Sequence, residues 1–180
     1  MKSHLRLLAP VLALLCGGAL AGCASEYAPP TSTARQPTPK PAELMRENIL
    51  NAFDAQVAAF VHASETSDAN DPALPATTVD PLLSTVRQNL STQLQQGIVS
   101  RGTITPQAHV DSMTASSAVV LSCSWDALIE VYAADGQPVP GQPGGIEPGY
   151  DAVRTTMVLT PQGWKASASN VQIGSCPPGY

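Results

Sequence analysis

The sequence predicts an α+β fold in which two N-terminal helices cover one face of an antiparallel sheet of about four strands. Apolar residues recur at spacings of three and four in residues 41–97, and they alternate with polar residues after Ile98. Short turns separate the alternating segments. Because long strands joined by short turns favour antiparallel pairing, and amphipathic helices must bury their apolar side, we expect the helices to lie on one face of the sheet.

The first helix is expected over residues 41–65. Pro41 and Glu43 suit a first helical turn. The apolar positions that follow define one face of this helix: Leu44, Ile49, Leu50, Phe53, Val57, Phe60 and Val61. The segment 64–78 is rich in Ser, Asp, Asn, Pro and Thr, so it is expected to be a loop.

A second helix is expected between Asp80 and Gly97. Asp80 suits the N-cap and Pro81 the first helical position, while Gly97 is typical of the residue that ends a helix. The apolar face of this helix comprises Leu82, Leu83, Val86, Leu90 and Leu94.

Four strands are expected after the helices, over residues 104–111, 118–132, 153–159 and 164–173. Three segments separate them: 114–116, the Gly/Pro-rich 135–149 and 160–163. The last segment, Thr-Pro-Gln-Gly, is a tight turn, so it predicts a hairpin.

The first 22 residues have the pattern of a secretory signal. Lys2 and Arg6 supply positive charge, and the apolar run 7–20 is short of the roughly 20 residues that a membrane-spanning helix needs. The residues Leu20-Ala21-Gly22-Cys23 that follow resemble the lipobox of bacterial lipoproteins. This resemblance implies cleavage before Cys23 and a diacylglycerol on its sulfur; an ordinary signal followed by a free cysteine is the alternative.

Lipid on Cys23 would anchor the chain at the extracytoplasmic face of the cell membrane without spanning it. Each buried methylene contributes about 0.8 kcal/mol, so two acyl chains hold a protein stably. Residues 23–40 include four prolines and show no apolar period, which predicts a disordered tether. O-mannosylation of Thr31, Ser32, Thr33 or Thr38 is the alternative to a plain spacer. Residues 41–180 are then expected to form one globular domain.

Charge and cysteine content limit the partners. Removing Lys2 and Arg6 with the signal changes the formal net charge from −5 to −7, which argues against a nucleic-acid partner. Of the four cysteines, Cys16 leaves with the signal and Cys23 takes lipid. Cys123 and Cys176 remain, and in an oxidising compartment they are expected to pair. No metal or cofactor is expected.

The order of these parts resembles the NTF2-like, or cystatin-like, fold, and more narrowly the small actinobacterial lipoproteins of this fold. The segments that carry the resemblance are Asp80–Leu83, Gln96–Gly102, Ala118–Asp126, Asp135–Val139, Gly163–Ala166 and Cys176. The resemblance implies a cone-shaped cavity between helices and a curved sheet, a disulfide from Cys123 in the second strand to Cys176 after the last, and no common activity. Members usually have an acidic residue directly after the first of these cysteines, where this chain has Ser124.

Few residues are candidates for chemistry. An NTF2-like enzyme would need an acid or histidine buried in the cone with a shifted pKa. His62 and His109 are expected to be solvated, and Asp126 to lie at a sheet rim or to accept a backbone hydrogen bond. Trp125 and Trp164 are expected to pack in the core or at the rim, with pocket walls as the alternative. The chain has no Gly-x-Ser-x-Gly, Walker, His-Glu-x-x-His or Cys-x-x-Cys motif, and Gly141–Gly149 is expected to be a hairpin connection.

These observations favour a non-enzymatic, membrane-anchored envelope lipoprotein that binds an envelope protein or a cell-wall component. The alternative is a carrier of a small apolar or glycan ligand in the cone, and the third hypothesis is an isomerase or dehydratase. A cone filled by Phe53, Val57 and Phe60 would favour the first. A cavity of several hundred cubic ångströms would favour the second, and an inward-facing acid with a raised pKa the third.

Overall fold

The computed structural model describes residues 40–142 and 145–176. The signal peptide, Cys23 and the tether up to residue 39 lie outside the described residues, so the predictions made for them stay predictions. Among the described helices, none is long and apolar enough to cross a membrane.

Helix α1 (Pro41–Ser64) confirms the first predicted helix to within one residue at its end. Its first turn is closed by Glu43, whose Oε2 accepts the backbone N–H of Lys40 at 2.9 Å. Ile49 and Phe53 are fully buried, which fixes the side of the helix that faces the sheet.

The predicted loop 64–78 contains a short helix that the sequence did not indicate, α2 (Ala73–Thr77). Asp71 starts it by accepting the Ala73 N–H at 2.7 Å. Helix α3 (Leu82–Gln95) begins one residue later than expected, although Asp80 still accepts the backbone N–H of Ser84 at 3.1 Å. Gly97 has a φ of +68° and ends the helix, as predicted.

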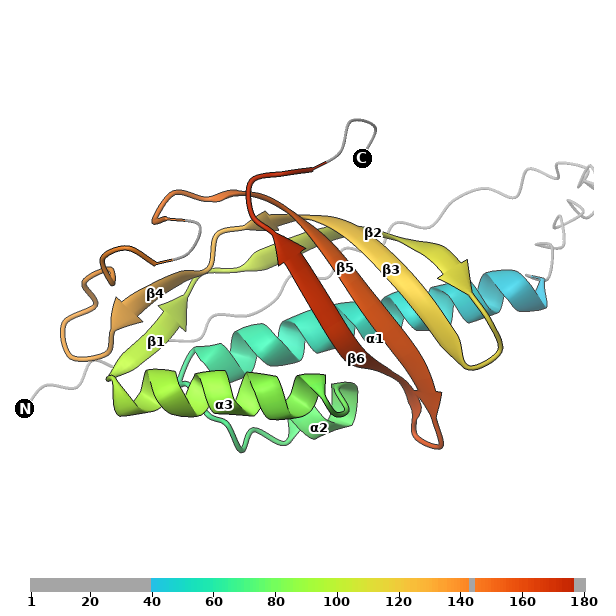
Figure 1. Ribbon diagram of the computed structural model, residues 1–180, viewed down its shortest axis with the longest axis horizontal. Helices are drawn as coiled ribbons and strands as arrows, with labels where there is room; N and C mark the ends of the chain where they lie inside the picture. Colours follow the sequence, from blue (N-terminus) through green and yellow to red (C-terminus); the bar gives the residue numbers. More distant parts are fainter. Residues whose placement is uncertain (1–39, 143–144, 177–180) are drawn as a thin grey trace, which may run out of the picture. The chain divides into compact units, whose positions relative to one another are not determined.

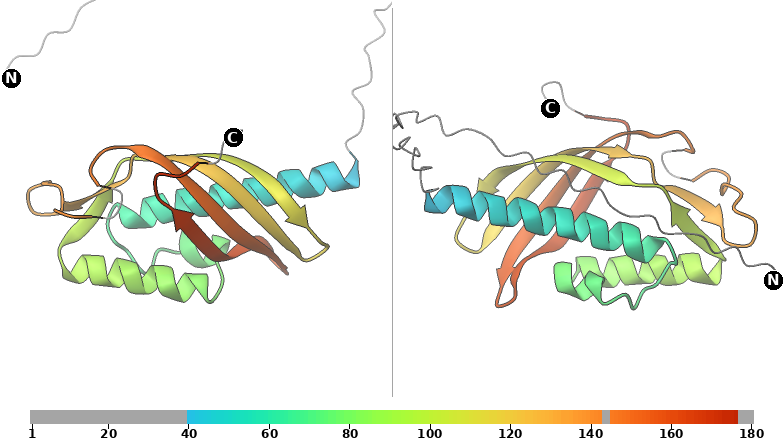
Figure 2. Two further views of the ribbon diagram at one scale, coloured as in Figure 1. Left: turned by 45° about the horizontal axis from the view of Figure 1, so that its top comes forward. Right: turned by 180° about the vertical axis from the view of Figure 1, so that it is seen from behind.

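Four long strands form one antiparallel sheet in the order β2-β3-β5-β6 (Figure 1). They are β2 (Ile104–Met113), β3 (Ser117–Asp126), β5 (Gly149–Thr160) and β6 (Gly163–Gln172). The sheet curves over α1, and α1 and α3 lie on its concave side (Figure 2). The predicted α+β fold class, with N-terminal helices on a curved antiparallel sheet, is therefore confirmed.

A second, two-stranded sheet corrects one prediction. The strand expected to run from residue 118 to 132 stops at Asp126, and β4 (Ile129–Tyr132) pairs instead with β1 (Ile98–Arg101). The two sheets separate where the backbone of Gly102, between β1 and β2, contacts the backbone of Ala127, between β3 and β4. Gly102 has a φ of +117°, and a Cβ there would collide with the Ala127 carbonyl oxygen. Close backbone contact therefore sets the point where the sheets separate.

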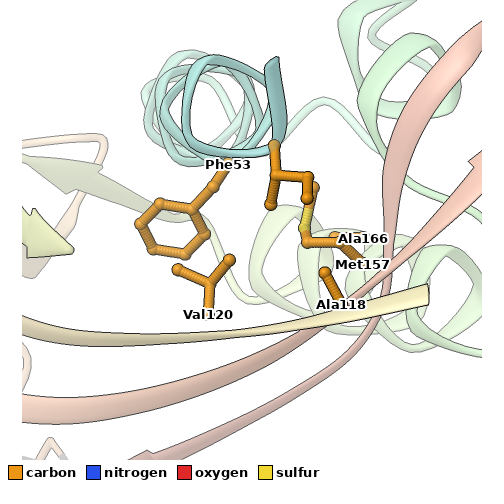
Figure 3. Packing of buried hydrophobic residues seen from close by; sticks show 6 residues of the cluster. Phe53, Ala118, Val120, Met157 and Ala166 are labelled. Carbon is orange, nitrogen blue, oxygen red and sulfur yellow. The ribbon is translucent and has the colours of Figure 1, made fainter. Parts of the chain in front are cut away.

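The main core lies between α1 and the concave face of the sheet (Figure 3). Its buried members are Ile49, Phe53, Ala118, Val120, Met157 and Ala166. A second buried cluster joins the helices to one another and consists of Ala63, Leu74, Val86 and Leu90. Phe53 of the first cluster and Val86 of the second also line a cavity next to β3 and β5.

Candidate functional site

The concave face of β3 and β5 changes from apolar to polar along the strands. Successive side chains of a strand point to opposite faces of the sheet. Residues at even spacing from the core positions Val120 on β3 and Met157 on β5 therefore face the helices as well. On β3 the further positions on this face are Ser122, Ser124 and Asp126. Ser122 and Ser124 are buried, and their hydroxyls lie 2.9 Å apart. The sheet therefore presents hydroxyls and a carboxylate at one end and aliphatic side chains at the other.

A cavity of about 330 Å³ lies between this face and the helices. Aromatic and aliphatic groups of the helices, notably Phe53, Val57 and Phe60, form one wall. The strands supply the polar wall, which includes Ser124, Asp126, Asp151, Thr155 and Ser169 of the four-stranded sheet and Glu130 of β4. The volume and mixed lining are typical of a small-molecule site. Phe53, Val57 and Phe60 thus line the cone without filling it.

Asp126 ends β3 at the edge of the cavity and is half-buried. Its Oδ1 accepts the backbone N–H of Leu128 at 2.8 Å, which agrees with the role expected from the sequence. Burial raises the pKa of Asp126 above its ordinary value, the hydrogen bond from Leu128 opposes this rise, and the charge of Asp151 adds to it.

Two further carboxylates line the cavity. Asp151 of β5 is 9% exposed, and its Oδ1 accepts the backbone N–H of Gly174 at 2.9 Å. Glu130 of β4 accepts a hydrogen bond from Gln93 Nε2 of α3 at 2.7 Å. The backbone of Glu130 is held in turn by the buried Gln142, whose side chain bonds both its N–H and its carbonyl oxygen.

A second hollow, of about 270 Å³, adjoins the cavity at the rim of the sheet. It shares Asp126, Asp151 and Val171 with the cavity and adds Glu147. The two aspartates therefore stand at the junction between an inner, largely apolar space and an outer, acidic one.

Cys123 and Cys176 form a disulfide with a Cα–Cα distance of 5.6 Å, so the predicted pairing is confirmed. Cys123 lies on the convex side of β3, opposite in direction to Ser124, and the bond ties the segment after β6 to the sheet. Trp125 shares this side and contacts the ring of Tyr150 edge-on, with ring centroids 4.9 Å apart. Neither the disulfide nor Trp125 lines the cavity.

The remaining candidates lie away from the cavity lining. His62 is exposed on α1, with its ring nitrogens 3.8 Å from Glu65 and 3.5 Å from Asp71. His109 lies on the solvent side of β2, and Trp164 packs against the main core. Within residues 40–142 and 145–176, no three His, Cys, Asp or Glu side chains are grouped to hold a metal ion.

Sequence reasoning found Asp126 but missed Asp151 and Glu130. Asp151 had a usable signal, because it lies two residues before Val153, in phase with Val153, Thr155 and Met157 on the inward side of the strand. An acid in phase with a buried strand face indicates a site or a rim. Glu130 had no such sequence signal, because β4 was predicted as the continuation of β3.

Neither a family model nor a curated protein matches this chain. Solved structures do resemble it. The intermembrane-space region of the chloroplast protein ARC6 is 16% identical, with a TM-score of 0.56 over 72% of this chain and 97% of that one. An NTF2-like protein with a cystatin-like fold from Novosphingobium aromaticivorans is 15% identical, with a TM-score of 0.45 over 73% and 86%. A protein of the NTF2-like family from Streptomyces avermitilis is 15% identical, with a TM-score of 0.45 over 69% and 94%. At these identities the likeness concerns the fold alone.

Proposed function

We propose that this chain is a lipid-anchored envelope protein that binds a small, mostly apolar molecule in the cavity between α1, α3 and the sheet. The observation that supports this function best is the cavity of about 330 Å³ itself, with one aromatic and aliphatic wall and one polar wall. Cys23 would hold the domain at the membrane, where apolar molecules concentrate. Binding of a protein or cell-wall partner, the first hypothesis from the sequence, stays a prediction for the outer surface.

The proposed role is non-enzymatic. Among the described residues that line the cavity, the ionisable side chains are carboxylates, and no histidine, lysine or tyrosine stands beside them. Proton transfer is the second candidate function, because Asp126 lies in the cavity with a raised pKa. An isomerase of this kind would lose all turnover in Asp126→Asn, whereas a carrier would still bind its ligand.

The test is a titration with N-phenylnaphthylamine, an uncharged fluorescent probe for apolar sites. The full chain is used with Cys23→Ala, which removes the expected lipid and the need for detergent. Val153→Phe, which adds volume inside the cavity, should abolish saturable binding. Leu121→Phe makes the matched change on the opposite face and should leave it intact. Equal binding by the Val153→Phe variant and the parent chain would contradict the proposal.

A further inference from the structure

The cavity has an acidic end, and from this we infer that its ligand carries a positively charged head group, such as a primary amine, on an apolar body. This inference rests on the proposed ligand-binding function and adds the chemical class of the ligand. The head group lies between Asp126 and Asp151, at the junction with the rim hollow. The body extends inward against Phe53, Val57 and Phe60.

The charges that face the two spaces are all negative. Asp126, Glu130 and Asp151 line the cavity, and Glu147 joins the two aspartates in the rim hollow. The described residues that α1, α3, β1, β2 and β6 contribute to the lining are uncharged. Lys165 of β6 lines neither space, and its ammonium group donates to the Pro75 carbonyl at 2.7 Å. Carboxylates facing one low-dielectric space without a cation attract a positive ligand.

Asp151 has hydrogen-bonding capacity to spare. Asp151 is nine-tenths buried, and its hydrogen bond with the Gly174 N–H engages Oδ1 alone. An ionised carboxylate accepts up to about four hydrogen bonds, so the second oxygen is available to a donor in the cavity. The second carboxylate oxygen of Asp126 is available in the same way, because the Leu128 N–H bonds to Oδ1. An ammonium group has three N–H donors and would satisfy both carboxylates.

A bound cation would also offset the repulsion between Asp126 and Asp151. Asp126 and Asp151 lie on one face of adjacent strands, and the charge of Asp151 disfavours ionisation of Asp126. A metal ion fits this place less well than an amine, because no third ligand is grouped with the pair among the described residues. A bare metal ion would bury no apolar surface against the aromatic and aliphatic wall, whereas an alkyl or arylalkyl amine would bury its apolar body there.

The test compares three probes with one apolar body and different heads: phenylbutylamine, phenylbutanol and phenylbutyrate. Calorimetric titration of the full chain carrying Cys23→Ala should show the amine binding about tenfold more tightly than the alcohol, and the carboxylate binding most weakly. In Asp151→Asn and Asp126→Asn the preference for the amine should be lost while the affinity for the alcohol stays the same. Asparagine keeps an acceptor for Gly174 or Leu128, so both variants should fold. Asp111→Asn, on the exposed side of β2, is the matched control and should keep the preference.

Equal affinities for the amine and the alcohol in the parent chain would overturn the charge inference and leave the proposed function standing. A preference for the amine that survives both asparagine variants would overturn it as well. If none of the three probes binds, the inference also fails, and the N-phenylnaphthylamine titration then decides separately whether the cavity binds any ligand.

Discussion

Asp126 of β3 and Asp151 of β5 lie one diagonal step apart on the concave face of the sheet. The register sets this relationship, because Ser124 pairs with Asp151 and Asp126 pairs with Gly149. Diagonal neighbours in an antiparallel pair are about 7–8 Å apart at Cα, close enough for their side chains to act on one group. The loop before β5 therefore brings together two acids that are far apart in the sequence.

Replacing Asp126 by asparagine should make stability less dependent on pH. The pKa of Asp126 is higher in the folded state than in the unfolded state. Between these two pKa values the folded state binds more protons than the unfolded state, so the free energy of unfolding decreases as pH rises through this range. Asp126→Asn should therefore melt at a higher temperature than the parent chain at neutral pH. Its advantage should vanish below the unfolded pKa of about 3.9. A variant that melts at a lower temperature at neutral pH would contradict the pKa direction.

Removing the disulfide should destabilise the domain without abolishing ligand binding in the cavity. Cys123 and Cys176 are 53 residues apart, and a loop of that length is worth about 4 kcal/mol in the chain-entropy model. The double variant Cys123→Ser/Cys176→Ser should lose about that much unfolding free energy in urea, and it should still bind N-phenylnaphthylamine. Unchanged stability would show that the bond does not constrain the unfolded chain.

Met157 should be among the costly positions of the core. Met157 is fully buried against α1, so Met157→Ala should lower the free energy of unfolding by about 2–5 kcal/mol. Leu159 lies two residues further along the same strand but is 47% exposed, so Leu159→Ala is the matched control and should cost under about 1 kcal/mol. Similar losses in urea unfolding for the two variants would contradict the placement of the core.

The elements predicted well are those with a long, regular pattern. Helix α1 and strands β2, β5 and β6 each extend over ten or more residues, so their apolar period is unambiguous. Helix α2 was missed because its five residues bury Leu74 alone, which is too little to show a period. The break after Asp126 was also missed, because Ala127 and Leu128 are not turn-forming residues. The bend there depends on Gly102, which belongs to a different segment.

The site was less predictable than the fold. Each wall of the cavity is an ordinary amphipathic face in sequence, so neither wall indicates a cavity by itself. The backbone hydrogen bond of Asp126 was predicted, but its neighbour Asp151 was not, since the pairing of β3 with β5 depends on register across a long loop. The Gly/Pro-rich segment gives no signal for that register.

Cys23→Ala should release the chain from membranes. The resemblance to a lipobox implies that this cysteine carries a diacylglycerol, and two acyl chains would account for stable attachment. In fractionated cells the variant should move from the membrane to the soluble fraction, while Cys16→Ala, inside the expected signal peptide, should not. A Cys23→Ala protein that remains fully membrane-bound would contradict the lipoprotein prediction.

The most direct measurement of ligand binding in the cavity is an NMR titration of the isotope-labelled full chain carrying Cys23→Ala with N-phenylnaphthylamine. The proposal predicts amide shifts at residues whose side chains line the cavity, such as Phe53, Ser124 and Val153, and little change at His109 on β2 or Leu159 on β5. Shifts confined to the convex side around Trp125 and Tyr150, or no shifts at all, would contradict it.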